Sequence, residues 1–193
     1  MKSLNVKLLL LTVGLLFVTI GKANVISENA IKSALQVGKR PISDQMKDSN
    51  RKPKEILNFF KVAPETVVLD VLAGSGYYSE ILSGVVGPKG KVIIHNDKHF
   101  LAYYGKSLTE RLGSGERLSN VKRMDISLNN LELKENSVDT ILLVLGYHDF
   151  YYVMNGAETI DVKKVLSKFR KFLKPNGVIG IIDHEAIKGS PSN

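Results

Sequence analysis

The ten residues VLDVLAGSGY, Val68–Tyr77, are the most informative segment of this chain about its fold. Their β-branched and leucine side chains are typical of a buried parallel strand, which we expect over Val67–Val71. Gly74 and Gly76 then permit a tight turn with positive φ angles. The next segment, Tyr77–Val86, has apolar side chains at helical spacing. A strand, a glycine turn and a helix in this order present free N–H groups and the positive end of a helix dipole, where an anionic group fits.

The same alternation continues along the chain. The further strands that we expect are Val92–His95, Val121–Met124, Val138–Leu145 and Val178–Ile182. The helices that we expect are Lys54–Phe60, Leu101–Leu112 and Val162–Leu173, with Asp48 and Ser49 as cap candidates for the first. Strands that alternate with helices through short links indicate an α/β protein with a Rossmann-like, doubly wound parallel sheet of five strands.

The first 23 residues have the pattern of a secretory signal peptide. Lys2 and Lys7 give a positive start, Leu8–Ile20 carries no charge, and Gly21 and Ala23 place small residues before a cut after Ala23. The apolar run is short for a membrane span of about 20 residues. We therefore expect an exported protein without a stable membrane span after cleavage, periplasmic in a Gram-negative host; an uncleaved N-terminal anchor is the alternative. Residues 24–50 form an N-terminal helical extension, and 51–193 form the main domain.

Composition excludes several kinds of site. The chain has no cysteine, so disulfides, thiolate metal sites and a catalytic thiol are absent. The net charge is +8, but without the leader 24 basic residues face 19 acidic ones. The densest basic run, within 163–174, alternates with apolar residues at helical spacing, which indicates a solvated helix face; a patch for nucleic acid or anionic lipid is the alternative.

Two cofactor classes use a glycine turn of this kind. A dinucleotide prefers G-x-G-x-x-G with its pyrophosphate above the helix start, whereas here Ser79 occupies the place of the third glycine. Asp70, directly before the loop, would repel a pyrophosphate but would favour an ammonium group. The residues therefore favour S-adenosylmethionine, whose amino acid end carries both charges. A dinucleotide oxidoreductase is the weaker alternative.

The segment Val68–Tyr77 resembles the first motif of class I S-adenosylmethionine-dependent methyltransferases, an acid followed by G-x-G-x-G, with Leu72 in place of the first glycine. The resemblance extends over about Arg51–His184 and includes the turn Lys174–Gly177 before the last strand. It implies methyl transfer to a small-molecule acceptor. The cofactor-binding residues that it implies in the loop are Asp70, Ala73, Gly74 and Gly76.

The resemblance also implies cofactor contacts at later strand ends. Asn96 or the adjacent Asp97 would bond the ribose hydroxyls, and Asp125 would accept from the adenine amino group. Asp139 matches a structural acid at the start of the fourth strand. A narrower resemblance, to a group of exported bacterial predicted methyltransferases, is carried by Arg51-Lys52-Pro53, by the helix start Gly76–Glu80 and by Gly146–Asp149.

The end of the fourth strand holds the candidates for proton transfer. His148 is a candidate to take a proton from the acceptor, and Asp149 would orient it; a loop histidine bonded to backbone is the alternative. The aromatic residues around them would line an acceptor pocket or simply pack. Asp183-His184-Glu185 contains metal-ligand types, but adjacent strand side chains point to opposite faces, so we expect no metal site and retain His184 as a pocket residue.

Only ten residues follow Asp183, so the C-terminal antiparallel hairpin of the family has no room. The fifth strand would then expose an apolar edge, which favours a homodimer or a partner that covers it. The Asn-Pro-Pro-Tyr pattern of amino-group methylation on DNA is absent from the sequence, and we expect no nucleic-acid partner. Leu72, Asn96 and the short C-terminus leave a second hypothesis open, a non-catalytic or degenerate S-adenosylmethionine-binding domain.

Overall fold

The computed structural model describes residues 25–36, 40–152, 158–185 and 189, and it contains one sheet of five parallel strands. The strand order is β3-β2-β1-β4-β5. The strands are β1 (Val67–Val71), β2 (Lys91–Asn96), β3 (Val121–Asp125), β4 (Val138–Val144) and β5 (Leu173–Ile182). The expected Rossmann-like parallel sheet is confirmed, and the described residues contain no antiparallel hairpin.

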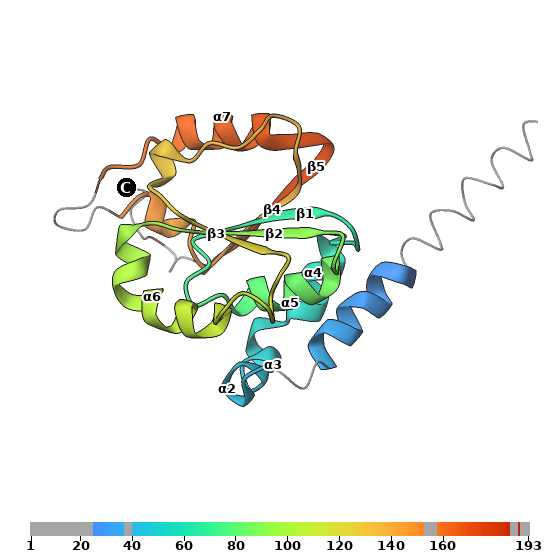
Figure 1. Ribbon diagram of the computed structural model, residues 1–193. Coiled ribbons are helices and arrows are strands. Elements are labelled where there is room, and N and C mark those ends of the chain that lie inside the picture. Colours follow the sequence, from blue (N-terminus) through green and yellow to red (C-terminus); the bar gives the residue numbers. More distant parts are fainter. Residues whose placement is uncertain (1–24, 37–39, 153–157, 186–188, 190–193) are drawn as a thin grey trace, which may run out of the picture.

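Helices cover both faces of the sheet (Figure 1). The longer helices are α4 (Pro53–Phe59), α5 (Tyr77–Val86), α6 (Lys98–Leu112) and α7 (Val162–Phe172). The short ones are α2 (Ile42–Gln45), α3 (Asp48–Arg51) and the 3-10 turns η1 (Leu128–Asn130) and η2 (His148–Phe150). In Figure 1, α4, α5 and α6 lie below the sheet and α7 lies above it.

Side-chain alternation in β1 separates the two halves of the core. Val68 packs with the α5 side, whereas Leu69 and Val71 pack with Phe169 and Phe172 of α7. Because successive side chains of a strand point to opposite faces, Asp70 projects toward α5 like Val68. The carboxyl ends of all five strands meet at one edge of the sheet, which is where this architecture binds ligands.

The N-terminal extension packs against the start of α5. Arg40 donates two hydrogen bonds to Asp48, at 2.7 and 2.9 Å, and the Tyr77 hydroxyl donates to the same carboxylate at 2.6 Å. The bonds from Arg40 hold the pKa of Asp48 below its usual value although burial opposes this shift. The extension therefore lies directly beside the glycine turn.

Most element boundaries differ by no more than one residue from the sequence expectations, and three features differ more. Helix α6 begins three residues earlier than expected, at Lys98, because Asp97 caps it by accepting from the N–H groups of His99 and Phe100. Asp48 lies inside the short helix α3 and bonds Arg40 instead of capping α4. The expected turn Lys174–Gly177 belongs to β5 as an irregularity, because the pairing with β4 shifts between Val138 and Thr140.

Strand β5 is at the edge of the sheet, and Val178 and Ile181 are each 40% exposed. No helix in the described ranges is long and apolar enough to cross a membrane. The expected signal peptide, residues 1–23, lies outside the described residues and stays a prediction.

The contact between α5 and the helical residues 25–36 gives a test of the fold. A Cβ atom on Gly84 would lie 2.9 Å from the Cβ atom of Ala34, closer than real contacts allow. Gly84→Ala should therefore lower the free energy of unfolding by about 1–2 kcal/mol despite the better helix propensity of alanine. Gly105→Ala, in α6, is the matched control, since its Cβ would lie 3.7 Å from Leu101. It should raise stability by about 0.5–1 kcal/mol. Urea unfolding of both variants checks this pair, and equal effects would contradict the packing.

Candidate functional site

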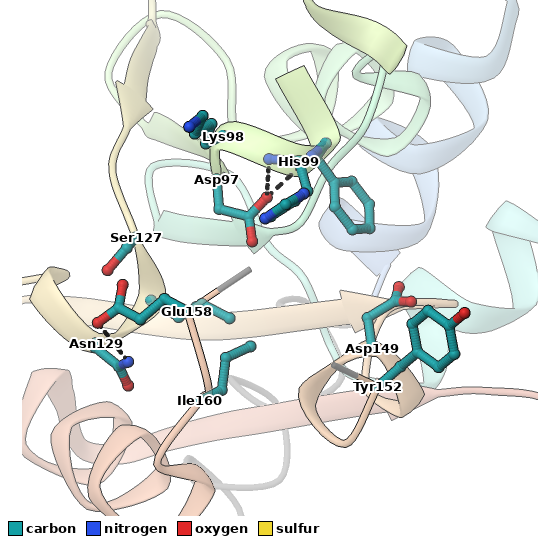
Figure 2. A pocket seen from close by; sticks show the side chains of 11 residues that line it. Asp97, Lys98, His99, Ser127, Asn129, Asp149, Tyr152, Glu158 and Ile160 are labelled. Atoms are coloured by element: carbon teal, nitrogen blue, oxygen red, sulfur yellow. Dashed lines mark hydrogen bonds between the residues drawn. The ribbon is translucent and has the colours of Figure 1, made fainter. Parts of the chain in front are cut away.

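A pocket of about 240 Å³ lies at the carboxyl edge of the sheet (Figure 2). Its walls come from segments that follow β2, β3 and β4 and from the residues that lead into α7. The lining residues are Asp97, Lys98, His99, Phe100, Ser127, Leu128, Asn129, Asp149, Tyr152, Glu158 and Ile160. Residues far apart in the sequence thus converge on one cavity, as expected where a parallel sheet binds a ligand.

Asp97 supplies a carboxylate whose direction is fixed. Its Oδ1 atom accepts from the N–H groups of His99 and Phe100, both at 2.9 Å, at the start of α6. Its other oxygen, Oδ2, has no hydrogen-bond partner in the described part of the chain. The carboxylate is therefore oriented by the helix and keeps one oxygen for a ligand that donates hydrogen bonds.

Ser127 supplies a polar group without a partner. Its Oγ atom is the only buried side-chain nitrogen or oxygen in the described ranges that makes no hydrogen bond. An unsatisfied buried hydroxyl costs free energy and calls for a partner. The Glu158 carboxylate lies beside Ser127 (Figure 2), and Phe100, Leu128 and Ile160 add apolar side chains to the same pocket. The combination suits a flat ring that also carries polar atoms.

The glycine turn is attached to the end of β2. The Ala73 N–H donates to the His95 carbonyl at 3.0 Å, and the Gly74 N–H donates to Oδ1 of Asn96 at 2.8 Å. Asn96 also donates from Nδ2 to the Gly74 carbonyl at 3.0 Å. Asn96 is fully buried, so its amide holds the turn, and Asp97 is the one of the two candidates that faces the pocket.

Leu72 takes the left-handed backbone that its place in the turn requires. Its φ angle is +51°, a conformation that costs a residue with a side chain about 1–2 kcal/mol. Its N–H group has a long contact of 3.5 Å to Nδ1 of His95, whose Nε2 lies 2.9 Å from the Ile126 carbonyl. Burial lowers the pKa of His95 to about 4, so a neutral imidazole links the turn to the end of β3.

Asp70 lies beneath the turn and is 2% exposed. The Ser79 hydroxyl donates to its Oδ2 atom at 2.5 Å. Burial raises the pKa of Asp70 to about 7, although the bond from Ser79 acts in the opposite direction. Ser79, which replaces the third glycine of a dinucleotide motif, is thus the partner of this carboxylate.

A network of buried charges holds the other end of the turn. Arg111 of α6 donates to the Ser75 carbonyl at 2.5 Å and to Asp44 of α2 at 2.6 Å. It also donates to Glu80 of α5, which accepts from Arg117 as well. Three helices are thereby joined to the backbone of the glycine turn.

Asp125 lies away from the pocket. Both of its carboxylate oxygens are 2.8 Å from Nε of Arg123, and Arg123 donates further to Thr109 of α6. The pocket is instead lined by Ser127 and Asn129, two and four residues later. A role for Asp125 at adenine stays a prediction.

His148 is held by the end of β5. Its Nδ1 atom is 2.8 Å from Oδ1 of Asp183, and its backbone N–H donates to Oδ2 of the same carboxylate at 2.9 Å. The Nε2 atom lies 3.5 Å from Asp149, which lines the pocket. Burial raises the pKa of Asp183, but the bonds from His148 and His184 outweigh it, so the net shift is downward. Burial raises the pKa of Asp149.

The His184 ring lies beside this group, with its centroid 5.9 Å from that of His148. Asp183 is thus the residue that orients His148. From the sequence, this role had been expected for Asp149. In the described ranges, no group of three or more histidine and acidic residues has the geometry to hold a metal ion.

Several residues of this site have no motif in the sequence. Ser127, Asn129, Glu158 and Ile160 line the pocket, and Asp183 orients His148. Ser127 and Asn129 follow β3, so the rule that ligands bind at the carboxyl ends of parallel strands could have found them. Glu158 and Ile160 precede α7 and have no such signal.

No protein-family model and no curated protein matches this chain. Solved structures do match it. A SAM-dependent methyltransferase from Aquifex aeolicus is 27% identical, with a TM-score of 0.58 over 85% of this chain and 78% of that one. A SAM-dependent O-methyltransferase from Thermotoga maritima is 18% identical, with a TM-score of 0.51 over 67% of this chain and 42% of that one.

A third similar structure is phosphoethanolamine N-methyltransferase 1 from Haemonchus contortus, solved with phosphoethanolamine and S-adenosylhomocysteine. It is 16% identical, with a TM-score of 0.53 over 80% of this chain and 32% of that one. The chain thus spans less than half of the Thermotoga and Haemonchus proteins. These neighbours share the class I methyltransferase fold with the chain.

Because the carboxyl group of Asp70 is buried, we expect the stability of the protein to depend on pH. Its pKa is about 7 in the folded protein and about 4 in an unfolded chain. The folded state therefore binds the proton more tightly, and the stabilisation present below about pH 4 is lost as the pH rises to about 7. Relative to Asp70→Asn, the wild-type protein should lose up to about 4 kcal/mol of unfolding free energy between about pH 4 and pH 8. Urea titrations of both proteins measure this difference; parallel pH profiles would contradict the assignment.

Proposed function

We propose that this protein transfers a methyl group from S-adenosylmethionine to a small-molecule acceptor. The observation that carries the proposal is the pocket at the ends of β2, β3 and β4, where the directed Asp97 carboxylate and the buried Ser127 hydroxyl share one cavity with the apolar side chains of Phe100, Leu128 and Ile160. The similarity to the Aquifex methyltransferase, at 27% identity, supports the same function.

The residues of the pocket fit the adenosine end of this cofactor. The free oxygen of Asp97 would accept hydrogen bonds from the ribose hydroxyls. Phe100, Leu128 and Ile160 would enclose the adenine ring, and Ser127 would bond one of its nitrogen atoms. The pocket is smaller than the roughly 300–1,000 Å³ typical of sites that enclose a whole ligand. The remainder of the cofactor would therefore extend along the glycine turn.

The methionine end would lie over Ala73, Gly74 and Gly76. Gly74 and Gly76 have φ angles of +59° and +82°, which permit the tight turn, and Tyr104 and Arg111 of α6 pack against these two glycines. Asp70 lies beneath the turn, and its charge would favour the cofactor's ammonium group. Such a cation would lower the pKa of Asp70 and so favour its ionised form at neutral pH.

The cofactor supplies an electrophilic methyl group on a positively charged sulfur. With this cofactor bound, the acceptor atom would form a bond to the methyl carbon as the carbon–sulfur bond breaks, and the sulfur would keep the electron pair. The protein aligns the reacting atoms and excludes water. His148 would take a proton from an acceptor that must lose one: Asp183 holds Nδ1, and Nε2, which lies 3.5 Å from Asp149, is the nitrogen that would accept the proton.

A second candidate function is cofactor binding without turnover. Leu72 motivates it, because this residue stands in place of the first glycine of the motif and takes a left-handed backbone with a φ angle of +51°. Conversion of S-adenosylmethionine to S-adenosylhomocysteine in the presence of acceptors separates the two functions.

The role of Asp97 can be tested by titration calorimetry with S-adenosylmethionine and S-adenosylhomocysteine. Asparagine caps helices as well as aspartate does, so Asp97→Asn should keep α6 intact and remove only the charge. We expect its dissociation constant for either ligand to rise about tenfold, since a hydrogen bond to a charged group contributes about 1.5–3 kcal/mol.

The matched control is Asp161→Asn, at the cap of α7, where Asp161 accepts from the Lys164 N–H. Asp161 does not line the pocket, and this variant should bind both ligands like the wild type. An absence of binding heat with folded wild-type protein would refute the proposed function, and equal affinities of the Asp97 variant and the wild type would refute the role of Asp97.

A further inference from the structure

A second concave surface lies near the same edge of the sheet, between the N-terminal segment and the ends of β4 and β5. Its volume is about 550 Å³. Arg51 and Lys52 border it where α3 meets α4, and Leu145 and Ile182 border it from the strand ends. We call this surface the α4–β5 groove. It shares no lining residue with the pocket assigned to adenosine.

The floor of the α4–β5 groove is apolar. Ile56, Leu145 and Ile182 are partly buried, and Phe59 on the rim is 76% exposed. Burial of apolar surface contributes about 25 cal/mol per Å². A ligand with an aromatic or aliphatic body would therefore gain free energy here.

The rim of the groove carries two cations without acidic partners. Neither Arg51 nor Lys52 forms an ion pair with any described residue, whereas the neighbouring Lys54 lies 3.8 Å from Glu28. Glu55 is the one acid among the described lining residues, so positive charge prevails.

Arg51 is also held in place. Its guanidinium lies over the Tyr77 ring, 4.7 Å from the centroid, and its carbonyl accepts from the Tyr78 hydroxyl at 2.6 Å. A fixed cation loses little conformational freedom when it binds an anion.

The groove and the adenosine pocket lie at two sides of one strand end. Val144 and Leu145 line the groove, and Asp149, four residues later, lines the pocket. Between them, Gly146 packs against Leu72 of the glycine turn, where a Cβ atom on Gly146 would lie 3.3 Å from the Leu72 side chain. The methionine end of a cofactor that runs along the glycine turn would thus point from the pocket toward the groove.

We propose that the α4–β5 groove binds the methyl acceptor and that the acceptor is a small apolar molecule with an anionic group. The apolar floor takes its body, and Arg51 and Lys52 bind the anion. The identification as an acceptor site rests on the proposed function, but binding of such a molecule does not.

The test uses two probes of the same shape. 4-Phenylbutyrate carries a carboxylate, and 4-phenylbutan-1-ol carries a hydroxyl in its place. Titration calorimetry on the wild-type chain should show binding of the carboxylate about tenfold tighter than of the alcohol, as expected for an ion-paired hydrogen bond. In the double variant Arg51→Met/Lys52→Met, affinity for 4-phenylbutyrate should fall about tenfold and affinity for the alcohol should change less than about twofold.

Two further variants complete the test. Lys54→Met removes a neighbouring charge that does not line the groove, and its affinity for 4-phenylbutyrate should equal that of the wild type. Glu55→Gln removes the acid of the rim and should strengthen 4-phenylbutyrate binding about two- to threefold. This variant leaves Arg51 and Lys52 unchanged, so it tests the proposal even if the double variant does not fold.

Four outcomes would overturn the proposal. The wild type could bind the two probes with equal affinity, or the double variant could lose affinity for both probes equally. Alternatively, Lys54→Met could lose as much affinity for 4-phenylbutyrate as the double variant, or Glu55→Gln could leave that affinity unchanged. A parallel titration with S-adenosylhomocysteine separates this inference from the proposed function. Binding of S-adenosylhomocysteine without 4-phenylbutyrate refutes the groove alone, and the reverse result refutes the methyltransferase function and leaves an anion-binding groove.

Discussion

The attachment of the glycine turn to the end of β2 is the constraint on which the site depends. Gly74 exchanges two hydrogen bonds with the Asn96 amide, and Ala73 donates to the His95 carbonyl. These bonds offset the cost of the left-handed backbone at Leu72. They also fix where the turn leaves the sheet, and therefore where Tyr77 starts the next helix and meets the N-terminal extension. Without them the turn would relax, and the backbone of Ala73 and Gly74 would shift relative to β2.

The buried charges around Arg111 act on the same turn from the opposite side. Arg111, Glu80 and Asp44 are each almost completely buried, with side-chain exposures of 8%, 4% and 4%. Burial of charges costs free energy that their attraction repays only partly, so such a network adds little net stability. Removal of one member, however, leaves the others buried and unpaired. The network therefore fixes the position of α2 and α6 relative to Ser75 more than it strengthens the fold.

Much of the fold could be predicted because apolar spacing determines it. Strand β1 and helix α5 lie where the sequence placed them, since Val67–Val71 and Tyr77–Val86 have unambiguous patterns. Helix α6 begins earlier than its apolar residues suggest, because its start is set by the Asp97 cap and not by burial. The irregularity in β5 arises from the pairing with Val138 and Thr140, which no local pattern records.

The site was less predictable because it depends on which way single side chains point. Asn96 and Asp97 are neighbours at the end of β2, and their side chains point to opposite faces. The sequence could not choose between them, since a shift of one residue reverses the assignment. The structure makes this choice. Ile94 and Asn96 point to the face of the sheet that carries α5 and the glycine turn, so Asp97 points to the other face. Asp183 was not assigned to His148 because the two are 35 residues apart and meet only when β5 pairs with β4.

The different roles of Asn96 and Asp97 give a physical reason for asparagine at position 96. An aspartate there could accept from the Gly74 N–H, but its second oxygen would face the Gly74 carbonyl, and two acceptors repel. The amide supplies both the acceptor and the donor that the turn needs. The carboxylate of the site is then left to Asp97, where the first N–H groups of α6 orient it. Asn96 thus holds the turn, while Asp97 supplies the carboxylate that lines the pocket.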